Sequence, residues 1–393
     1  MTTTTAQQQL GIFLEHAAEG LDLPDSIRDE ARKKYQQIGE WLKDDHEQQY
    51  ASDAEIYVQG STRLGTGIRP VKDEDEYDID LVYRRDIKKQ SITQDDLKTQ
   101  VGDQLYRYIR YLKQKKEQAP TLIEGSRCWT LDYPGKFHMD ILPALPDDEP
   151  YLQNTRDYDD AIIITDKDLR TWKYSNPKGY SNWFHEQMHM AFREQREFMA
   201  KAASVDVEDI LEQDVKTTLQ RSVQLLKRHR DIRYQGNPDD KPVSIIITTL
   251  AAHAYQNQAD FYEAFISIVK GMKDYIEVRN GKYWVGNPVN PNGENFADKW
   301  ETEPQRKERF FQWLSQVESD IEQALRQQGL GIDKVAGSLN PVFGDMLIKS
   351  ATKRYGDALL KQRRAGNLKV TLGTGMLGYT GARPVRPHTE YGD

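Results

Sequence analysis

The first part of the chain mixes helical and strand-like patterns of hydrophobic residues. Apolar residues recur at helical spacing in two stretches between residues 7 and 49, and again from 95 to 116. Short apolar runs typical of strands, bounded by glycine, proline or polar residues, lie at 55–58, 77–84, 121–134 and 137–145. This part is therefore predicted to combine helices with a sheet.

After about Thr165 the pattern changes to long helical periods. Helices are expected at 180–203, 211–234, 243–256, 260–276 and 307–327. The Asn-, Pro- and Gly-rich stretch 285–300 is predicted to be a loop, and the residues from 370 onward a flexible tail. We expect an α+β protein with an N-terminal part over 1–165, a helical domain over 166–369 and a tail over 370–393.

The composition excludes several classes of protein. A net charge of -8 argues against extended nucleic-acid binding, and the single cysteine, Cys128, excludes an intramolecular disulfide and a cysteine-based zinc finger. Cys128 itself is predicted to be a core residue and not a nucleophile. The chain shows no signal peptide and no apolar run long enough to span a bilayer, so we expect a cytoplasmic protein without membrane association.

Acidic residues interrupt two of the predicted strands. Asp78 and Asp80 alternate with Ile79, so both carboxylates point to one face of the strand, about 7 Å apart. Asp140 lies on the apolar run 137–145, and a neighbouring strand would bring it alongside. Three carboxylates on adjacent strands suit hard divalent cations, especially Mg²⁺, and two such ions can activate a hydroxyl and stabilise a leaving pyrophosphate.

A turn of two small residues follows the run 55–58. Gly60 lets the backbone approach a phosphate, and the N–H groups and hydroxyl of Gly60-Ser61 can donate hydrogen bonds to it. Taken singly, such turns and Asp-x-Asp pairs are common without function. Their combination with a later strand aspartate favours phosphate and metal chemistry.

These residues resemble the DNA polymerase β-type nucleotidyltransferase superfamily. The stretches GSTRLGTGIRP (60–70), YDIDLV (77–82) and HMDILPAL (138–145) carry the resemblance. Within this superfamily, the sequence most resembles the bacterial cGAS/DncV-like nucleotidyltransferases, the CD-NTases. These enzymes make cyclic oligonucleotides in anti-phage signalling. Further stretches extend it over most of the chain: IIITDKDLRTWKYSNPKGYSNWF, QRSVQLLKRHRD, KPVSIIITTLAAHAY and NPVNPNGENFADKW.

The resemblance implies a polymerase β-like nucleotidyltransferase core with an N-terminal helical segment, followed by a helical domain that closes the nucleotide cleft. It implies that Asp78, Asp80 and Asp140 are the catalytic residues and hold two ions, Mg²⁺ or Mn²⁺. Gly60 and Ser61 would bind the nucleotide triphosphate.

Two residues of the helical half match family positions that contact the triphosphate. These are Lys227 in LLKRHRD and Ser244 in KPVSIII. From the residues alone, Lys227 is predicted to be a solvated helix residue, and only the resemblance favours the contact with the triphosphate. For Ser244 the alternative is a helix N-cap after Pro242, which does not exclude a phosphate contact. The implied reaction is template-independent: NTPs, ATP or GTP or both, are joined into a cyclic di- or trinucleotide second messenger.

Alternatives within and outside the superfamily remain. A related enzyme could make a linear oligonucleotide or transfer a nucleotide elsewhere, and a nucleotide sensor without catalysis would have little use for three mutually repelling carboxylates. His185 and His189 also satisfy the H-E-x-x-H pattern of zinc metallopeptidases, with Glu208 or Glu212 available as a third ligand. That pattern lies in a predicted helical scaffold and leaves the strand acids without a role.

The C-terminal stretch GARPVRPHTEYGD (381–393) resembles tails that ubiquitin-like conjugation proteins join to a target. It departs from them by ending in Asp393, where a small residue such as Gly392 is expected. A terminus without a role is therefore the favoured interpretation, and a regulatory or conjugating protein that acts on the tail is the alternative that the resemblance implies.

Overall fold

A computed structural model describes residues 5–43, 54–72, 76–147, 157–168, 171–370, 377–378 and 383–385. The chain forms two compact units. One comprises Leu23–Glu186 and Asn287–Glu294, and the other Met1–Asp22, Gln187–Gly286 and Asn295–Asp393. The domain boundaries expected near residues 165 and 370 stay a prediction.

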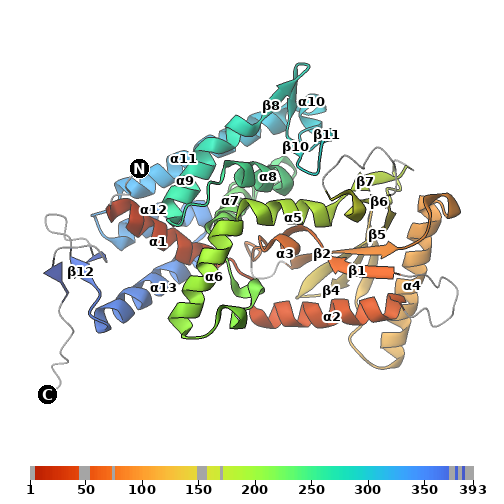
Figure 1. The fold of residues 1–393 in the computed structure, drawn as a ribbon, viewed down its shortest axis with the longest axis horizontal. Coiled ribbons are helices and arrows are strands. Elements are labelled where there is room, and N and C mark those ends of the chain that lie inside the picture. Colours follow the sequence, from red (N-terminus) through yellow and green to blue (C-terminus); the bar gives the residue numbers. More distant parts are fainter. Residues whose placement is uncertain are drawn as a thin grey trace. The chain divides into compact units, whose positions relative to one another are not determined.

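The first unit is built on a mixed seven-stranded sheet (Figure 1). The strands follow the order β1 (Ala54–Val58), β2 (Tyr77–Arg85), β5 (Phe137–Pro146), β4 (Trp129–Tyr133) and β3 (Thr121–Glu124). In addition β6 (Ile162–Ile164) pairs with β5, and β7 (Lys173–Ser175) with β6. β2 and β5 run parallel, whereas the other strand pairs described in this sheet are antiparallel.

Two helices cover one face of this sheet, α2 (Asp25–Lys43) and α4 (Gln94–Gln114). Their apolar residues recur at helical spacing and pack against alternate residues of the strands; the shared core includes Ile38, Leu42, Leu97, Val101, Leu105, Ile79, Leu81, Leu131, Met139 and Ile141. Since these strand residues point toward the helices, the polar residues between them lie on the opposite face.

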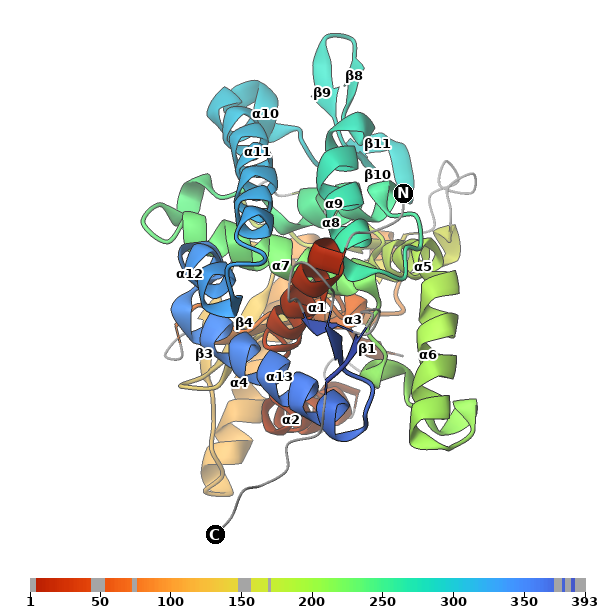
Figure 2. The same ribbon diagram turned by 90° about the vertical axis from the view of Figure 1, so that its left-hand side faces the viewer.

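The second unit is helical. It contains α1 (Thr5–Glu19), α6 (His189–Ala203), α7 (Thr218–Arg233), α8 (Ser244–Ala254), α9 (Phe261–Gly271), α11 (Pro304–Arg326), α12 (Ile332–Phe343) and α13 (Asp345–Arg364). α1 packs against α7, α9 and α13, although it is far from them in sequence (Figure 2). The core of the unit is aromatic, with Phe13, Phe265, Phe310, Trp313 and Phe343 fully buried. None of the described helices is long and apolar enough to cross a membrane.

Short strands complete the described residues. β8 (Glu277–Arg279) and β9 (Lys282–Trp284) form a hairpin whose turn residues, Asn280 and Gly281, both have positive φ. β12 (Lys369–Val370) lies between β13 (Leu377–Gly378) and β14 (Arg383–Pro384), so described parts of the predicted tail are paired. Residues 386–393 of the expected conjugation tail lie outside the described residues.

Several predicted elements differ from the structure, among them the helix expected over 211–234, which begins only at Thr218. The strand expected over 121–134 is two strands, because a turn closed by the hydrogen bond from Gly125 N to Cys128 O (3.0 Å) separates β3 from β4. The loop expected over 285–300 contains β10 (Gly286–Asn287), β11 (Asn290–Asn295) and the short helix α10 (Lys299–Thr302). The helix expected over 180–203 is interrupted at Met188, which is fully buried and accepts a hydrogen bond from the Thr217 hydroxyl.

Candidate active site

The sheet brings two of the predicted acids directly side by side. The parallel register of β2 and β5 pairs Asp80 with Asp140, and Asp78 with His138. Their neighbours Ile79 and Met139 are 3% and 0% exposed in the core beneath α2 and α4, so the aspartates lie on the other face. Asp78 is exposed, whereas Asp80 and Asp140 are half-buried. We call Asp78, Asp80 and Asp140 the aspartate group.

Two residues that the sequence did not place at the site, Thr130 and Cys128, lie beside Asp140. Thr130 on β4 is its register partner, and the Thr130 hydroxyl donates a hydrogen bond to the Asp140 carboxylate. Burial and the charge of Asp140 raise the pKa of the Cys128 thiol to about 11. The thiol therefore stays protonated at neutral pH, which agrees with its predicted lack of nucleophilic character, although Cys128 lies in the turn before β4 and is only half-buried.

The Gly60-Ser61 turn lies against the Asp80 carboxylate. Gln59 N donates to Asp80 O (2.8 Å), which continues the pairing of β1 with β2 up to the turn. Gly60 has φ +58°, and a Cβ at this position would lie 2.4 Å from Oδ2 of Asp80. Only glycine fits there, on both conformational and steric grounds. Ser61 lies in the first turn of the short helix α3 (Gly60–Leu64), and its carbonyl accepts a hydrogen bond from Thr66 N (2.9 Å).

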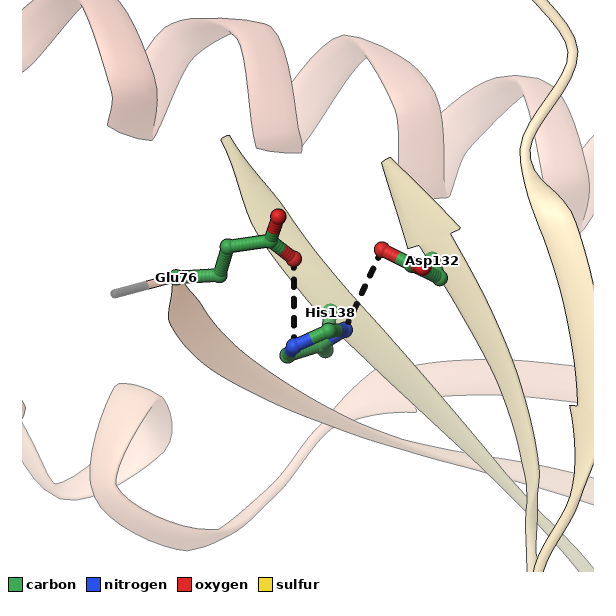
Figure 3. A group of neighbouring side chains, drawn as sticks. All are labelled: Glu76, Asp132 and His138. Atoms are coloured by element: carbon green, nitrogen blue, oxygen red, sulfur yellow. Dashed lines mark ion pairs between the residues drawn. The ribbon is translucent and has the colours of Figure 1, made fainter. Parts of the chain in front are cut away.

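A second polar group, Glu76–His138–Asp132, lies on the same face of the sheet (Figure 3). Nε2 of His138 is 3.1 Å from Oε2 of Glu76, and its Nδ1 is 3.4 Å from Oδ1 of Asp132. Burial and the charge of Glu76 raise the pKa of Asp132. The spacing of the three side chains would admit a cation. Each ring nitrogen already faces a carboxylate, however, so the imidazole itself lies between the two acids.

The two predicted triphosphate contacts of the helical half lie on α7 and α8. Lys227 is only 5% exposed, so the solvated-residue alternative is wrong. Ser244 is the first residue of α8 and Val243 is the N-cap, so the N-cap alternative is wrong by one position. The Ser244 hydroxyl oxygen instead accepts a hydrogen bond from Nη1 of Arg230 (2.7 Å).

Comparison with known proteins decides the family. A family model described as the Second Messenger Oligonucleotide or Dinucleotide Synthetase domain matches residues 7–187. The chain is 32% identical over 399 residues, with both chains covered completely, to a c-di-GMP synthase of Roseivirga ehrenbergii. The chain belongs to this family. It is a bacterial cGAS/DncV-like nucleotidyltransferase, as its sequence motifs predict.

Solved structures of CD-NTases share the fold. The structure of the Bradyrhizobium diazoefficiens CD-NTase CdnG in complex with GTP superposes with a TM-score of 0.68 at 21% identity, covering 88% of this chain and 99% of that one. The Vibrio cholerae DncV cyclic AMP-GMP synthase superposes with a TM-score of 0.53 at 14% identity, covering 75% and 70% of the two chains. The predicted polymerase β-like core followed by a helical region is thereby confirmed.

The H-E-x-x-H pattern does not form a zinc site in this CD-NTase. α5 (Pro177–Gln187) carries His185, whereas His189 begins α6, so the continuous helix that the pattern needs is interrupted. Nδ1 of His185 donates to the Ser181 carbonyl (2.7 Å). In the part of the chain that the structure describes, no group of three metal-ligating side chains includes either histidine.

Proposed function

We propose that this nucleotidyltransferase joins two molecules of GTP into cyclic di-GMP. The observation that carries the proposal is its similarity, over the full length of both chains, to a protein named as a c-di-GMP synthase. The GTP complex of CdnG supports a guanine nucleotide as substrate. ATP as a co-substrate, a cyclic trinucleotide and a linear product are the alternatives.

The aspartate group fits two divalent cations, Mg²⁺ or Mn²⁺. Its donors are carboxylate oxygens, which hard cations prefer, and the parallel register places two of the carboxylates on adjacent strands, where like charges repel unless a cation lies between them. Asp78, Asp80 and Asp140 would hold the ions. When bound, the ions supply positive charge at the triphosphate and make the attacking hydroxyl more acidic.

Residues of the chain hold and orient the nucleotides in this proposal. The backbone of Gly60 and the hydroxyl of Ser61 bind phosphate oxygens, and the hydrogen bond from Thr130 orients the Asp140 carboxylate. The ammonium group of Lys227 balances charge on the triphosphate, and Ser244 donates a hydrogen bond to it.

Two successive transfers give the product. A ribose hydroxyl of one GTP attacks the α-phosphate of the other; a phosphodiester bond forms and pyrophosphate leaves. In the linear intermediate, a ribose hydroxyl then attacks the remaining α-phosphate, which closes the ring and releases a second pyrophosphate. One cyclic dinucleotide and two pyrophosphates therefore form for every two GTP consumed.

Purified protein incubated with Mg²⁺ and GTP alone, ATP alone or all four NTPs tests the proposal, with products identified by mass spectrometry and pyrophosphate measured in parallel. We expect cyclic di-GMP from GTP alone, with two pyrophosphates per product. A product that requires ATP, or a linear product only, would contradict the assignment to cyclic di-GMP.

We also infer that the product serves anti-phage signalling in the cytoplasm, as the CD-NTase resemblance implies, with a regulatory or conjugating protein acting on the C-terminal tail. The inference predicts that cells expressing the protein from its native operon resist phage and that Asp80→Asn removes the resistance. Equal plating of phage on both strains would contradict it.

A further inference from the structure

Arg230 connects α7 to the start of α8 through a buried guanidinium group. Arg230 is 5% exposed. Its Nη1 donates to the Pro242 carbonyl (3.1 Å) and to the Ser244 hydroxyl oxygen (2.7 Å). On its other side, Nε and Nη2 lie 2.9 Å and 2.8 Å from Oδ1 of Asp231. The guanidinium is therefore held on two sides and directed at one hydroxyl.

This contact determines what the Ser244 hydroxyl can do. A serine hydroxyl has one hydrogen to donate and lone pairs to accept with. Because the oxygen accepts from the charged Arg230 at 2.7 Å, its own hydrogen must point away from the guanidinium. Ser244 is half-buried, so a ligand can still reach it. The hydroxyl is thus oriented as a donor, which suits an anionic partner.

The backbone around Ser244 favours an anion as well. Ser244 is the first residue of an 11-residue helix, and Val243 at the N-cap makes no side-chain capping hydrogen bond. Residues with capping oxygens are strongly preferred at that position, because they accept hydrogen bonds from the first N–H groups of a helix. A valine leaves these donors without a side-chain cap, and the helix dipole adds partial positive charge there.

The charge of Arg230 itself is already balanced. Oδ1 of Asp231 accepts from two of its nitrogens and also lies 3.6 Å from Nζ of Lys241. A guanidinium paired in this way is suited to orient a neighbouring group and less suited to bind a phosphate directly. Its contact with the Pro242 carbonyl holds the backbone immediately before the helix.

We infer that Arg230 is a positioning residue for the nucleotide triphosphate. It fixes the Ser244 hydroxyl so that the hydroxyl hydrogen is presented to a phosphate oxygen, and it acts through Ser244 without touching the phosphate. The inference rests on the proposed function, in which Ser244 contacts the triphosphate.

A double-mutant cycle on nucleotide binding tests this inference. The dissociation constant of the α,β-methylene analogue of GTP, which cannot react, is measured with Mg²⁺ for wild type, Ser244→Ala, Arg230→Met and the double variant. Each single substitution is expected to weaken binding about tenfold, the value of a charge-assisted hydrogen bond. The double variant should bind no more weakly than the weaker single variant, because both remove the same contact.

Two further variants separate orientation from general stability. Arg326→Met removes an arginine whose side chain is 67% exposed and lies 4.0 Å from Glu322, so it should leave binding unchanged. Arg230→Lys keeps a charged donor and should recover part of the lost affinity, but only when Ser244 is present. If Arg230→Met does not fold, the cycle is completed with Arg230→Lys, and melting temperatures confirm that every compared variant is folded.

The outcomes either support or overturn the inference. Substitution of Arg230 could weaken binding by the same factor with and without the Ser244 hydroxyl. That result would show that Arg230 binds the phosphate directly or acts only on stability, and it would overturn the inference. Unchanged affinity in Ser244→Ala would overturn it as well. Product formation by wild type is measured separately. If the protein binds the analogue but makes no cyclic product, the proposed function is refuted, whereas the role of Arg230 is still tested by the double-mutant cycle on binding.

Discussion

The same face of one sheet carries two acidic groups that differ in their partners. In the Glu76–His138–Asp132 group, an imidazole lies between two carboxylates, with both ring nitrogens within 3.4 Å of an acid oxygen. In the aspartate group, Asp140 stands beside Asp80 and accepts its hydrogen bond from the neutral hydroxyl of Thr130. The first group has an imidazole between its acids, whereas the second sets two carboxylates side by side on adjacent strands, where we propose that a cation binds.

The difference shows that the number of carboxylates alone does not identify a metal site. Among the described residues, Glu76, His138 and Asp132 bring three ligand atoms within 4.8 Å of one another, whereas in the aspartate group the register pairs Asp80 with Asp140. What separates them is the imidazole between the acids of one group, and in the other a glycine whose added Cβ would lie against the Asp80 carboxylate. Changes that affect one group and spare the other therefore test the account.

The largest expected effect comes from neutralising the aspartate group. Asp78→Asn, Asp80→Asn and Asp140→Asn should each lower product formation about 10²–10³-fold or more, because each removes a charge that stabilises the transition state. Asp132→Asn is the matched control on the same face and should retain activity within about threefold, as expected for a partly exposed ion pair. Rates of pyrophosphate release measure both, and an equal loss in Asp132→Asn would remove the distinction between the groups.

The next effect comes from adding one methyl group at the turn. Gly60→Ala places a Cβ against the Asp80 carboxylate and should reduce product formation about 10²-fold through misplacement of that group. Gly281→Ala is the control, since Gly281 also has positive φ (+77°) but has nothing within 4 Å of the added atom. Gly281→Ala should lose about 1 kcal/mol of unfolding free energy and Gly60→Ala at least as much, because of the added steric conflict, and only Gly60→Ala should lose activity. Equal activity in the two variants would contradict the role of the turn.

These predictions depend on features that the sequence revealed because they are local. The alternation of apolar and acidic residues around Asp80 and Asp140 has a period of two, which predicts a strand and the face of each side chain without knowledge of the rest of the chain. Gly60 is also recognisable locally, because it lies in a turn of two small residues directly after a strand-like run. The sequence predicts that Asp140 lies near Asp80, but it does not predict that the two residues are direct register partners. The register depends on pairing between segments 60 residues apart.

The remaining features depend on distant partners. The polar sequence of α7 suggested a solvated face, yet Lys227, Arg228, His229 and Arg230 are all 2–5% exposed. The partners that make such burial possible come from other segments, as Asp320 does for His229. In the same way, the interruption at Met188 follows from burial of its side chain, which the helical pattern of the surrounding residues does not reveal.

A smaller effect is expected from removing the imidazole of the Glu76–His138–Asp132 group. His138→Gln leaves the carboxylates of Glu76 and Asp132 close together without the imidazole between them, and should lower the free energy of unfolding by less than about 1 kcal/mol. Product formation should change little. Urea denaturation measures the stability, and a loss of activity comparable to that of Asp80→Asn would instead place His138 in the reaction.

His229 lies in the helical unit, where burial lowers its pKa. Its Nδ1 accepts from Trp313 Nε1 (3.1 Å) and its Nε2 faces Asp320 (3.0 Å), so the folded protein holds it neutral. On acidification below 6.5 the unfolded chain binds a proton that the folded protein does not, so stability falls. The stability advantage of wild type over His229→Gln should shrink by about 1 kcal/mol between pH 7.5 and 5.5. An advantage that grows would indicate a charged His229–Asp320 pair.

The smallest effect is expected at the H-E-x-x-H residues. His185→Ala and His189→Ala should leave product formation unchanged, because both side chains are exposed and lie on different helices. Zinc analysis of protein purified without added metal should show no stoichiometric zinc. Stoichiometric zinc that disappears in these variants, together with peptidase activity, would support the alternative function.

Anomalous diffraction from crystals grown with Mn²⁺ and the α,β-methylene analogue of GTP tests the central claim most directly. The account predicts manganese peaks at the carboxylates of Asp80 and Asp140, with the triphosphate against the Gly60-Ser61 turn, and no peak at Glu76, His138 and Asp132. Manganese at the His138 group and none between Asp80 and Asp140 would contradict it.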